Sequence, residues 1–368
     1  MWRTNYTLGL GANRIAVYII DTQNDAIINT YIFHLHRQKL GETSPEFAPY
    51  AKHQVCQQVQ ECDLLYLPGQ PCGLFDSDYQ SWLQLLDVTE RLPTCRGLEK
   101  SGAWFVPCDN CSRSSSCYWR QSRWISNGCK DRQIPRSKLK ECFASKKLLF
   151  IGDSTNRGIM HYIMEQINGT LTEWDKTHNI KVYDYLNDGR TSTSFAYYPQ
   201  FWLPQDKRPG LEKALQQLVK RSVPLHNDSR TVFVIGGVQW LAMHHLNLLR
   251  STLNRVGLSG AKLVIKSHGA GFHQPVNGMR TISVGDFQTL HSLNQDLLNH
   301  GRRLGYNIVD TYGITMARYK DFMQGKCACH FHKIVENSNS STRLFHVDGD
   351  INAIYSEMIV NRICDWPS

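Results

Sequence analysis

The chain lacks any uninterrupted run of about 18 apolar residues, so the sequence predicts no membrane-spanning segment. Its longest apolar stretches, Lys147–Gly152 and Thr231–Ile235, have the length of buried strands. The chain is not poor in hydrophobic residues either, at 41% of its 368 residues. This share excludes a disordered or collagen-like protein and leaves room for one large domain with an appendage, or for two domains.

Dense runs of basic residues are missing as well. The 41 Lys and Arg exceed the 32 Asp and Glu, giving a net charge of +9, but they are spread along the chain between polar and apolar residues. A nucleic-acid-binding arm is denser and is interleaved with stacking aromatics. The sequence therefore predicts no nucleic-acid partner. The positive balance indicates a solvated basic face, with an acidic or sulfated glycan as the alternative partner.

The cysteines lack the spacing of a zinc finger or ribbon. Cys108 and Cys111 form one Cys-x-x-Cys pair, but no second pair follows at the required distance. The Cys- and His-containing segment Cys327–His332 also resembles a ligand set. However, alternate residues of a strand point to opposite faces, which makes a single tetrahedral site awkward there. We therefore predict no metal and no cofactor.

The cysteines that are present indicate an oxidising compartment. Nine of the 12 lie between Cys56 and Cys142, which is typical of a disulfide-tied layer, although the pairings cannot be read from the sequence. Five glycosylation sequons support the secretory pathway, either the endoplasmic reticulum lumen or the cell exterior. Their asparagines are Asn5, Asn110, Asn168, Asn227 and Asn339. Because no apolar signal-peptide core follows Met1, we expect a fragment or isoform of a longer secreted protein.

The chain divides into three segments. Two β-rich runs within residues 14–37 predict a hairpin, and since a lone hairpin is marginal in water we interpret residues 1–38 as the last strands of a β-sandwich. We interpret residues 39–94 as a Cys-containing linker and residues 95–368 as the main domain. This domain begins with a Cys- and Trp-rich lead-in, residues 95–146.

From Lys147 onward the pattern alternates between strands and helices. The predicted strands are Lys147–Ile151, Ile180–Leu186, Thr231–Ile235, Lys262–Ser267 and Tyr306–Val309. The predicted helices are Arg157–Ile167, Leu211–Arg221, Leu241–Val256, Val284–Leu304 and Asn352–Cys364. Such an alternation predicts an α/β domain with a parallel sheet covered on both faces, whose ligands bind beyond the carboxyl ends of the strands.

A short turn follows the first of these strands. Gly152-Asp-Ser154-Thr-Asn-Arg157 opens the first predicted helix. A serine at such a turn has its hydroxyl at the sheet edge, and its N–H lies at a helix N-terminus, where negative charge is stabilised. Ser154 is therefore a candidate nucleophile. The alternative is that Ser154 or Thr155 only caps the helix.

Three further residues fit acyl-transfer chemistry. His346 precedes the last predicted helix, from where a histidine can reach the top of the first strand and take the proton of the Ser154 hydroxyl. Gln239 follows the third predicted strand, so its amide can donate to a developing oxyanion. His268 follows the fourth predicted strand at the same edge, where it lines the pocket or belongs to the core.

Four motifs complete a recognisable combination. They are Gly102-Ala-Trp104, Arg123–Cys129, Gly152-Asp-Ser154-x-x-Arg157 and the aromatic-proline segment Phe195–Trp202. The combination resembles the PC-esterase branch of the SGNH/GDSL hydrolase superfamily over about residues 95–365. The resemblance implies a flavodoxin-like, three-layer α/β fold with a parallel sheet, and ester chemistry on acylated glycans or glycoproteins in the secretory pathway. It also implies that residues 1–38 end a cadherin-like β-sandwich.

The resemblance assigns roles to individual residues. Ser154 is implied as the nucleophile and His346 as the base. Gln239 stands where the superfamily has its oxyanion asparagine. Gly152 and Arg157 are implied to hold the oxyanion loop or the substrate.

One expected residue is absent. The acid that orients the base usually stands three residues before it, and that position is Arg343 here. Asp310 and Asp348 are candidate replacements. Otherwise the site is a Ser-His dyad oriented by a carbonyl, or the true base is His330 or His332.

Two functions are therefore consistent with the sequence. The first is a serine acylesterase or O-acyltransferase, and no residue decides whether water or a sugar hydroxyl accepts the acyl group. The second is a catalytically inactive module that binds glycans or proteins through exposed aromatic and basic residues. The missing acid favours the second, whereas the retained Ser154, Arg157 and His346 favour the first.

Overall fold

The computed structural model describes residues 14–21, 26–34, 54–62, 71–76, 95, 102–126, 129, 134–174, 178–271, 284–322, 330–337 and 343–364. The strands are β1 Arg14–Asp21, β2 Ala26–His34, β3 Gln54–Gln58, β4 Leu74–Asp76, β5 Gly102–Cys108, β6 Arg123–Ser126, β7 Lys147–Gly152, β8 Lys181–Leu186, β9 Thr191–Tyr197, β10 Thr231–Gly236, β11 Lys262–Lys266, β12 Asn307–Val309, β13 Lys333–Glu336 and β14 Phe345–Asp348. The α-helices are α2 Arg136–Phe143, α3 Ser154–Asn168, α4 Leu211–Ser222, α5 Met243–Arg255, α6 Val284–Arg303, α7 Tyr312–Met316 and α8 Asp350–Cys364. Short 3-10 helices lie at Ser114–Ser116, Trp119–Gln121, Gln205–Lys207 and Tyr319–Asp321.

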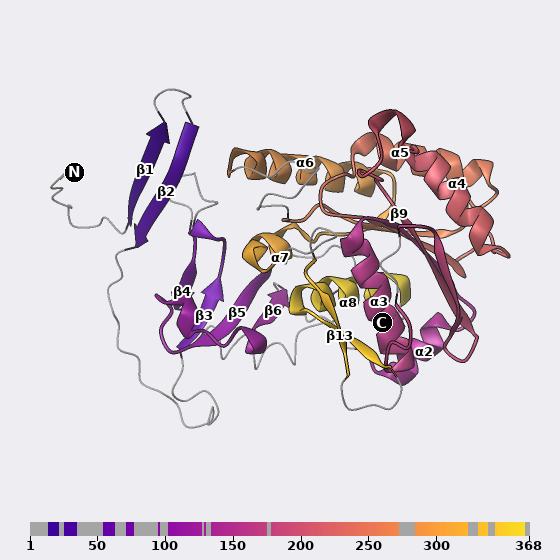
Figure 1. Cartoon of the computed structure of the whole chain (residues 1–368), viewed down its shortest axis with the longest axis horizontal. Coiled ribbons are helices and arrows are strands. Elements are labelled where there is room, and N and C mark those ends of the chain that lie inside the picture. Colours follow the sequence, from indigo (N-terminus) through magenta and orange to yellow (C-terminus); the bar gives the residue numbers. More distant parts are fainter. Residues whose placement is uncertain are drawn as a thin grey trace.

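A six-stranded sheet with the order β12-β11-β10-β7-β9-β8 forms the centre of the α/β domain (Figure 1). Five of its strands are parallel, and β8 at one edge is antiparallel. Numbered along the chain, the parallel strands follow the order 2-1-3-4-5, which is that of flavodoxin-like folds. The predicted fold class is thus confirmed. The order reverses between β7 and β10, so a ligand site is expected beyond their carboxyl ends.

Helices cover both faces of this sheet, with α2, α3 and α8 on one side and α4, α5 and α6 on the other (Figure 1). Alternate side chains of a strand point to opposite faces. Leu148 and Phe150 of β7 accordingly pack in the cluster that includes residues of α3 and α8, whereas Leu149 and Ile151 pack with residues of α4 and α5. The apolar run in β7 is therefore explained by burial on two sides, as predicted.

Two features of the sheet differ from the expectation. The strand predicted at 180–186 runs antiparallel at the sheet edge, with Asp184 and Tyr185 exposed. Its pairing partner β9 escaped prediction because its sequence, Thr-Ser-Thr-Ser-Phe-Ala-Tyr, is polar at first. These hydroxyls are nevertheless buried and bonded: Thr193 Oγ1 donates to the Leu148 carbonyl at 3.2 Å, and Ser194 Oγ lies 2.7 Å from Ser222 Oγ.

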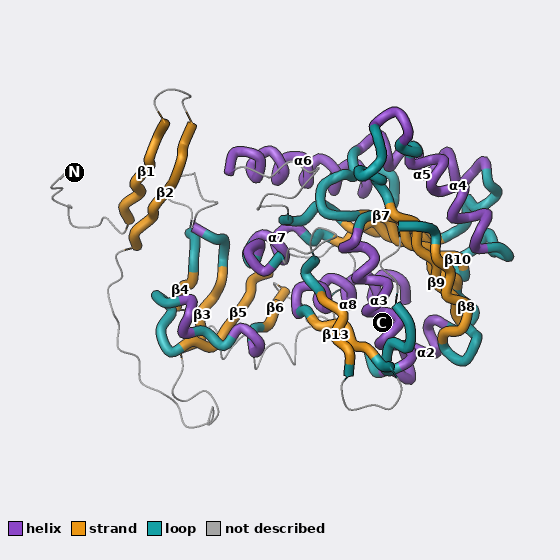
Figure 2. Tube along the Cα trace, viewed as in Figure 1, coloured by secondary structure: helices purple, strands orange, loops and turns teal. Residues whose placement is uncertain are grey.

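A second sheet, with the order β4-β3-β5-β6, precedes the α/β domain in the chain (Figure 2). Its strand β3 comes from the predicted linker and pairs with β5 of the lead-in, so the boundary predicted at residue 95 is crossed by hydrogen bonds. Trp104 of β5 is fully buried, and its Nε1 donates to the Ile314 carbonyl of α7 at 2.9 Å. Trp104 therefore ties the second sheet to the α/β domain. This contact gives the Gly-Ala-Trp motif a structural role.

Five disulfides connect ten of the 12 cysteines, at Cys56–Cys111, Cys62–Cys72, Cys95–Cys129, Cys108–Cys117 and Cys142–Cys364. The first four join cysteines within residues 56–129, in and around the second sheet, and the last joins α2 to the end of α8. Such a framework fits an extracellular or secretory-pathway protein. Cys327 and Cys329 lie outside the described residues.

The hairpin predicted near the start of the chain is present. Strands β1 and β2 pair antiparallel, from Arg14 opposite His34 to Asp21 opposite Ala26.

In the described part of the chain, no helix combines the length and the apolar composition that crossing a membrane requires.

Candidate functional site

Ser154 lies at the switch point of the sheet, as the first residue of α3 directly beyond β7. The N-cap of this helix is Asp153, whose Oδ1 accepts from the Thr155 N–H at 2.9 Å and from Thr155 Oγ1 at 2.6 Å. The other oxygen, Oδ2, accepts from the Val238 N–H at 2.7 Å. The capping role thus falls to Asp153, not to Ser154 or Thr155. The same carboxylate fixes the Ser154 turn to the loop that follows β10.

A buried lysine also stabilises the contact between the Ser154 turn and the loop after β10. Lys266, the last residue of β11, is 2% exposed, and its Nζ donates to the Gly237 carbonyl at 2.8 Å. Burial lowers the pKa of Lys266 to about 8, and the nearby Asp153 carboxylate opposes that shift. The Lys266 ammonium also lies 5.3 Å from the centre of the Tyr355 ring. The loops after β7 and β10 are therefore held by one network of charge and hydrogen bonds.

Tyr197 approaches Ser154 from the neighbouring strand. It is the last residue of β9, paired in register with Gly152, and it is 2% exposed. Its hydroxyl hydrogen-bonds Ser154 through both the serine side chain and the serine backbone N–H. Burial, the largest cause, and the Asp153 carboxylate raise the pKa of this hydroxyl well above its usual range. Tyr197 therefore stays a neutral phenol.

Arg157 and two aromatic side chains pack around Tyr197. The Arg157 guanidinium lies 5.8 Å from the centre of the Tyr197 ring. His178 and Trp202 each present their rings edge-on to Tyr197 at 4.8 Å, and they stack on each other at 3.9 Å. Trp202 is 38% exposed, so this group reaches the surface beside Ser154.

His332 packs against the first turns of α3. A side chain at Gly158 would overlap the His332 ring, so only a glycine leaves the ring room there. Because the Cα–Cβ direction in a helix tilts toward the N-terminus, the space that His332 takes lies over the turn that begins at Ser154. Asn352 of α8 also packs against Gly158, and its Nδ2 donates to the Gly158 carbonyl at 3.3 Å.

His330 and His161 complete a histidine cluster around this point. The rings of His330 and His332 are 4.7 Å apart, and both histidines interact electrostatically with His161. Burial, then the Arg157 charge and His330, lower the pKa of His161 to about 3. Burial also holds the pKa of His332 well below 6.5, with His330, His161 and Arg157 acting in the same direction. The rings of His161 and His332 are therefore neutral at physiological pH.

The buried His161 leads to a prediction for stability. Its folded-state pKa is lower than its unfolded one, so its contribution is complete above pH 6.5 and is lost as the pH falls toward 3. Between pH 7.5 and pH 5 the free energy of unfolding should fall by about 2 kcal/mol through this residue. Urea denaturation of His161→Leu should show a correspondingly flatter pH dependence. His226→Gln, at an exposed position, is the control, and equal slopes for all three proteins would contradict the prediction.

His346, the predicted base, lies elsewhere. It is in strand β14, not in a loop, and its neighbour Val347 donates its N–H to Glu165 Oε2 at 2.8 Å. Glu165 is eleven residues after Ser154 in α3, which corresponds to roughly 16 Å along the helix. The structure therefore does not bring His346 and Ser154 together. The reason is that β14, paired antiparallel with β13, lies along α3 toward the C-terminal end of that helix.

The residues just before β13 lie next to the residue just after β14. A side chain at Gly349, just before α8, would overlap the backbone of Phe331 and His332. The segment at His330–His332 consequently occupies the place in front of the last helix for which the sequence suggested His346. Sequence reasoning kept His330 and His332 as alternatives. The feature that distinguishes His332 is the packing of its ring against Gly158, one turn after Ser154.

The other predicted site residues are placed as follows. Gly152 has a packing role, since any side chain there would overlap the Gly236 carbonyl of the adjacent strand. Arg157 is 5% exposed and lies among Tyr197 and the histidine cluster. Gln239 directs its amide Nε2 to the Gly271 carbonyl at 3.4 Å.

In the described part of the chain, His268 and the two candidate acids bond groups other than Ser154. His268 is 4% exposed, and its ring bonds the Leu241 carbonyl, as a core histidine does. Asp310 accepts from Ser267 Oγ, from Asn294 Nδ2 and from the Tyr312 N–H, at 3.1–3.2 Å. Asp348 is exposed and pairs with Lys333 at 3.0 Å.

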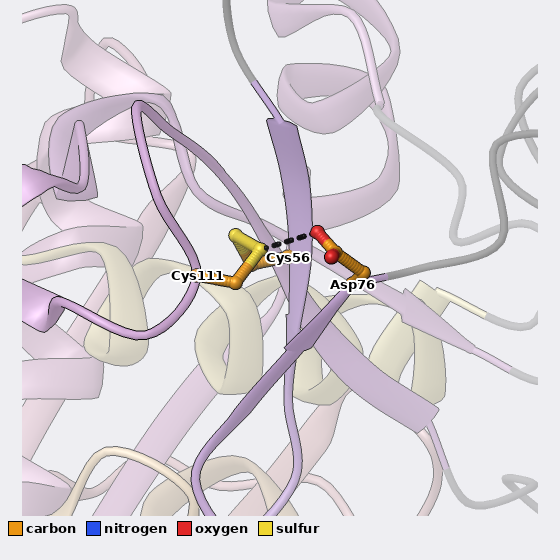
Figure 3. Close-up of side chains that lie close together, drawn as sticks. All are labelled: Cys56, Asp76 and Cys111. Atoms are coloured by element: carbon orange, nitrogen blue, oxygen red, sulfur yellow. Dashed lines mark hydrogen bonds between the residues drawn. A yellow bond between two sulfur atoms is a disulfide. The ribbon is translucent and has the colours of Figure 1, made fainter. Parts of the chain in front are cut away.

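One group of potential metal ligands occurs in the described part of the chain. Cys56 and Cys111 lie beside Asp76, whose Oδ1 is 3.0 Å from Cys111 Sγ (Figure 3). The two sulfurs form a disulfide, so neither is a thiolate that could bind a metal. Cys108, from the Cys-x-x-Cys motif, is likewise bonded to Cys117.

Three sequon asparagines lie on the surface. Asn110, Asn168 and Asn227 are exposed, as a glycan acceptor must be. Asn5 and Asn339 lie outside the described residues.

A comparison with known protein families places the chain. Residues 124–322, more than half of the sequence, match the family described as NXPE family member 4-like, C-terminal domain. The match begins in β6 and contains the Ser154 turn, Arg157, Tyr197 and Gln239. NXPE proteins are part of the PC-esterase and SGNH-like group that the sequence motifs indicated. The chain therefore belongs to the NXPE C-terminal domain family, and through it to the PC-esterase group of SGNH-like proteins.

Proposed function

We propose that this chain is a serine acylesterase or O-acyltransferase that acts on O-acyl groups of glycans or glycoproteins in the secretory pathway. The observation that carries the proposal is the position of Ser154 at the switch point of the sheet, with the His332 ring over the same helical turn. Membership in the PC-esterase group supports ester chemistry. The five disulfides support an oxidising compartment.

In the proposed reaction, the neutral His332 imidazole takes the proton of the Ser154 hydroxyl as the serine oxygen bonds the ester carbonyl carbon. The carbonyl π pair moves to its oxygen, whose negative charge faces the N–H groups at the start of α3. When this intermediate collapses, the bond to the leaving oxygen breaks and the imidazolium gives its proton to that oxygen. The acyl group on Ser154 then passes to water in an esterase, or to a sugar hydroxyl in a transferase, by the same proton route.

His332 has the properties that this role requires. A general base must be unprotonated before the reaction, and the lowered pKa of His332 keeps its ring neutral. In the described residues no carboxylate hydrogen-bonds this ring, and Gly158 and Asn352 pack around it instead. We therefore propose a Ser154–His332 dyad whose imidazole is oriented by packing.

The test is covalent labelling of the serine. The chain is incubated with a serine-directed fluorophosphonate, and hydrolysis of an aryl acetate is followed in parallel. We expect labelling and hydrolysis in the unchanged protein and in Ser356→Ala, which removes another buried serine, but in Ser154→Ala we expect neither. Equal labelling of Ser154→Ala would eliminate Ser154 as the nucleophile. An unlabelled, inactive parent protein would overturn the proposal in favour of an inactive glycan- or protein-binding module.

We also propose that residues 1–38 are the last strands of a cadherin-like β-sandwich, as in cadherin-like and PC-esterase domain-containing proteins. The antiparallel pairing of β1 with β2 supports this assignment. The exposure of Asn110, Asn168 and Asn227 supports their glycosylation.

A further inference from the structure

We infer that Tyr197 is a catalytic residue, whose hydroxyl donates a hydrogen bond to the oxyanion formed when Ser154 attacks an ester. This inference rests on the proposed function and adds a residue to it. It concerns the side chain that hydrogen-bonds the nucleophile itself, in a strand that the sequence analysis did not predict.

The hydrogen bonds with Ser154 fix the position of the Tyr197 hydroxyl. The backbone N–H of Ser154 can only donate, so the phenol oxygen accepts that bond, and the phenol proton is left for the Ser154 hydroxyl and for an oxyanion that forms beside it. An oxyanion that forms at the start of α3 faces the same N–H. The phenol is therefore already held at the edge of the position where negative charge develops.

Tyr197 is rigid and protonated, as an oxyanion donor must be. Its ring is fixed between Arg157 at 5.8 Å and the edge contacts with His178 and Trp202 at 4.8 Å. Burial raises the pKa of its hydroxyl well above the usual range, so the hydroxyl does not ionise in the neutral range. Pre-positioned donors are effective because they need no reorganisation during the reaction.

The residue predicted for this role is engaged elsewhere. The amide of Gln239 donates to the Gly271 carbonyl at 3.4 Å. Its side chain would have to break that bond to reach an oxyanion at Ser154. Tyr197 is in contact with Ser154 already, so its hydroxyl has only to turn its proton from the serine oxygen to the oxyanion. The inferred step is a hydrogen bond only: the phenol keeps its proton, and the electrons move as in the acylation step described above.

The test removes the hydroxyl and keeps the ring. Tyr197→Phe should lower kcat for an aryl acetate by about 10² to 10³, with KM nearly unchanged, because the bond forms only in the transition state. Phenylboronic acid, which forms a tetrahedral adduct with a serine, should bind the variant less tightly by a similar factor. Tyr183→Phe, at another buried tyrosine of the same sheet, should leave both quantities unchanged.

Three results would overturn the inference. A kcat for Tyr197→Phe within about threefold of the parent would show that the hydroxyl does not act in the reaction, and a higher kcat would show that it blocks the oxyanion position. A rise in KM with unchanged kcat would assign Tyr197 to substrate binding. Labelling of Ser154 separates the two proposals. If the parent is labelled and active and Tyr197→Phe is equally active, only the inference about Tyr197 is wrong. If the parent is not labelled, both proposals are wrong.

Discussion

Replacement of His332 by alanine is expected to lower kcat/KM for an aryl acetate by about 10³ to 10⁴, because the general base that accepts the Ser154 proton is removed. The same substitution at His346 should leave kcat/KM unchanged, since His346 lies beside Glu165 at the other end of α3. Parallel measurement of the two alanine variants therefore compares the base favoured by the structure with the base predicted from the sequence. Equal activities of His332→Ala and the parent would contradict the dyad.

Two additional variants separate chemistry from folding. His332→Gln keeps a polar side chain of similar length, so a loss of activity without a change in thermal stability identifies the imidazole as the group that matters. Gly158→Ala keeps both members of the dyad but adds a methyl group where the His332 ring packs. We expect Gly158→Ala to lose activity because the ring must move away from the Ser154 turn.

The pH dependence of the parent gives an independent check on the base. Because the folded-state pKa of His332 lies well below 6.5, kcat/KM should stay constant as the pH falls through 6.5. An inflection near 6.5 would indicate a base with an ordinary imidazole pKa and would exclude the buried His332.

Removal of the Cys142–Cys364 disulfide is expected to cause the largest loss of stability of any cross-link in the described part of the chain. Its two cysteines are 222 residues apart, so the bond restricts a long loop in the unfolded chain. The loop-entropy relation gives about 5 kcal/mol for a loop of that length. The native state adds a local reason, because the bond ties α2 to the end of α8, and α8 also carries Asn352 beside Gly158.

The measurement is urea denaturation of Cys142→Ser/Cys364→Ser. The matched control is Cys62→Ser/Cys72→Ser, which opens a bond between residues only 10 apart and should cost about 3 kcal/mol by the same relation. Replacing both cysteines avoids a free thiol in each case. A larger loss for the Cys62–Cys72 pair would show that loop length does not govern the contribution of these bonds.

The elements with strong apolar patterns were predictable. β7 and β10 are apolar throughout because they are buried on both faces, and α4 shows a regular apolar stripe because it packs on one face only. β9 was missed because its buried hydroxyls bond backbone carbonyls and the Ser222 hydroxyl of α4, so a polar sequence lies in the core. Hydrogen bonding between distant residues leaves no local signal in a sequence.

The candidate base could not be chosen from the sequence for a related reason. His346 stands close to the last helix in the chain, and sequence distance suggested that it reaches the sheet edge. The pairing of β13 with β14 places His346 away from that edge. It also brings His332, just before β13, next to Gly349, just after β14. A hairpin of this kind places residues that are 17 positions apart side by side.

By itself, then, the sequence determined the fold class, the Ser154 turn, the presence of a disulfide-tied layer and the PC-esterase resemblance, because each depends on local patterns or on composition. The tertiary structure decided which cysteines pair, which histidine packs on the first turns of α3, and that Tyr197 contacts the serine. These three outcomes depend on contacts between strands and helices far apart in the chain. Such contacts are set by how the layers pack, and no single segment of the sequence encodes them.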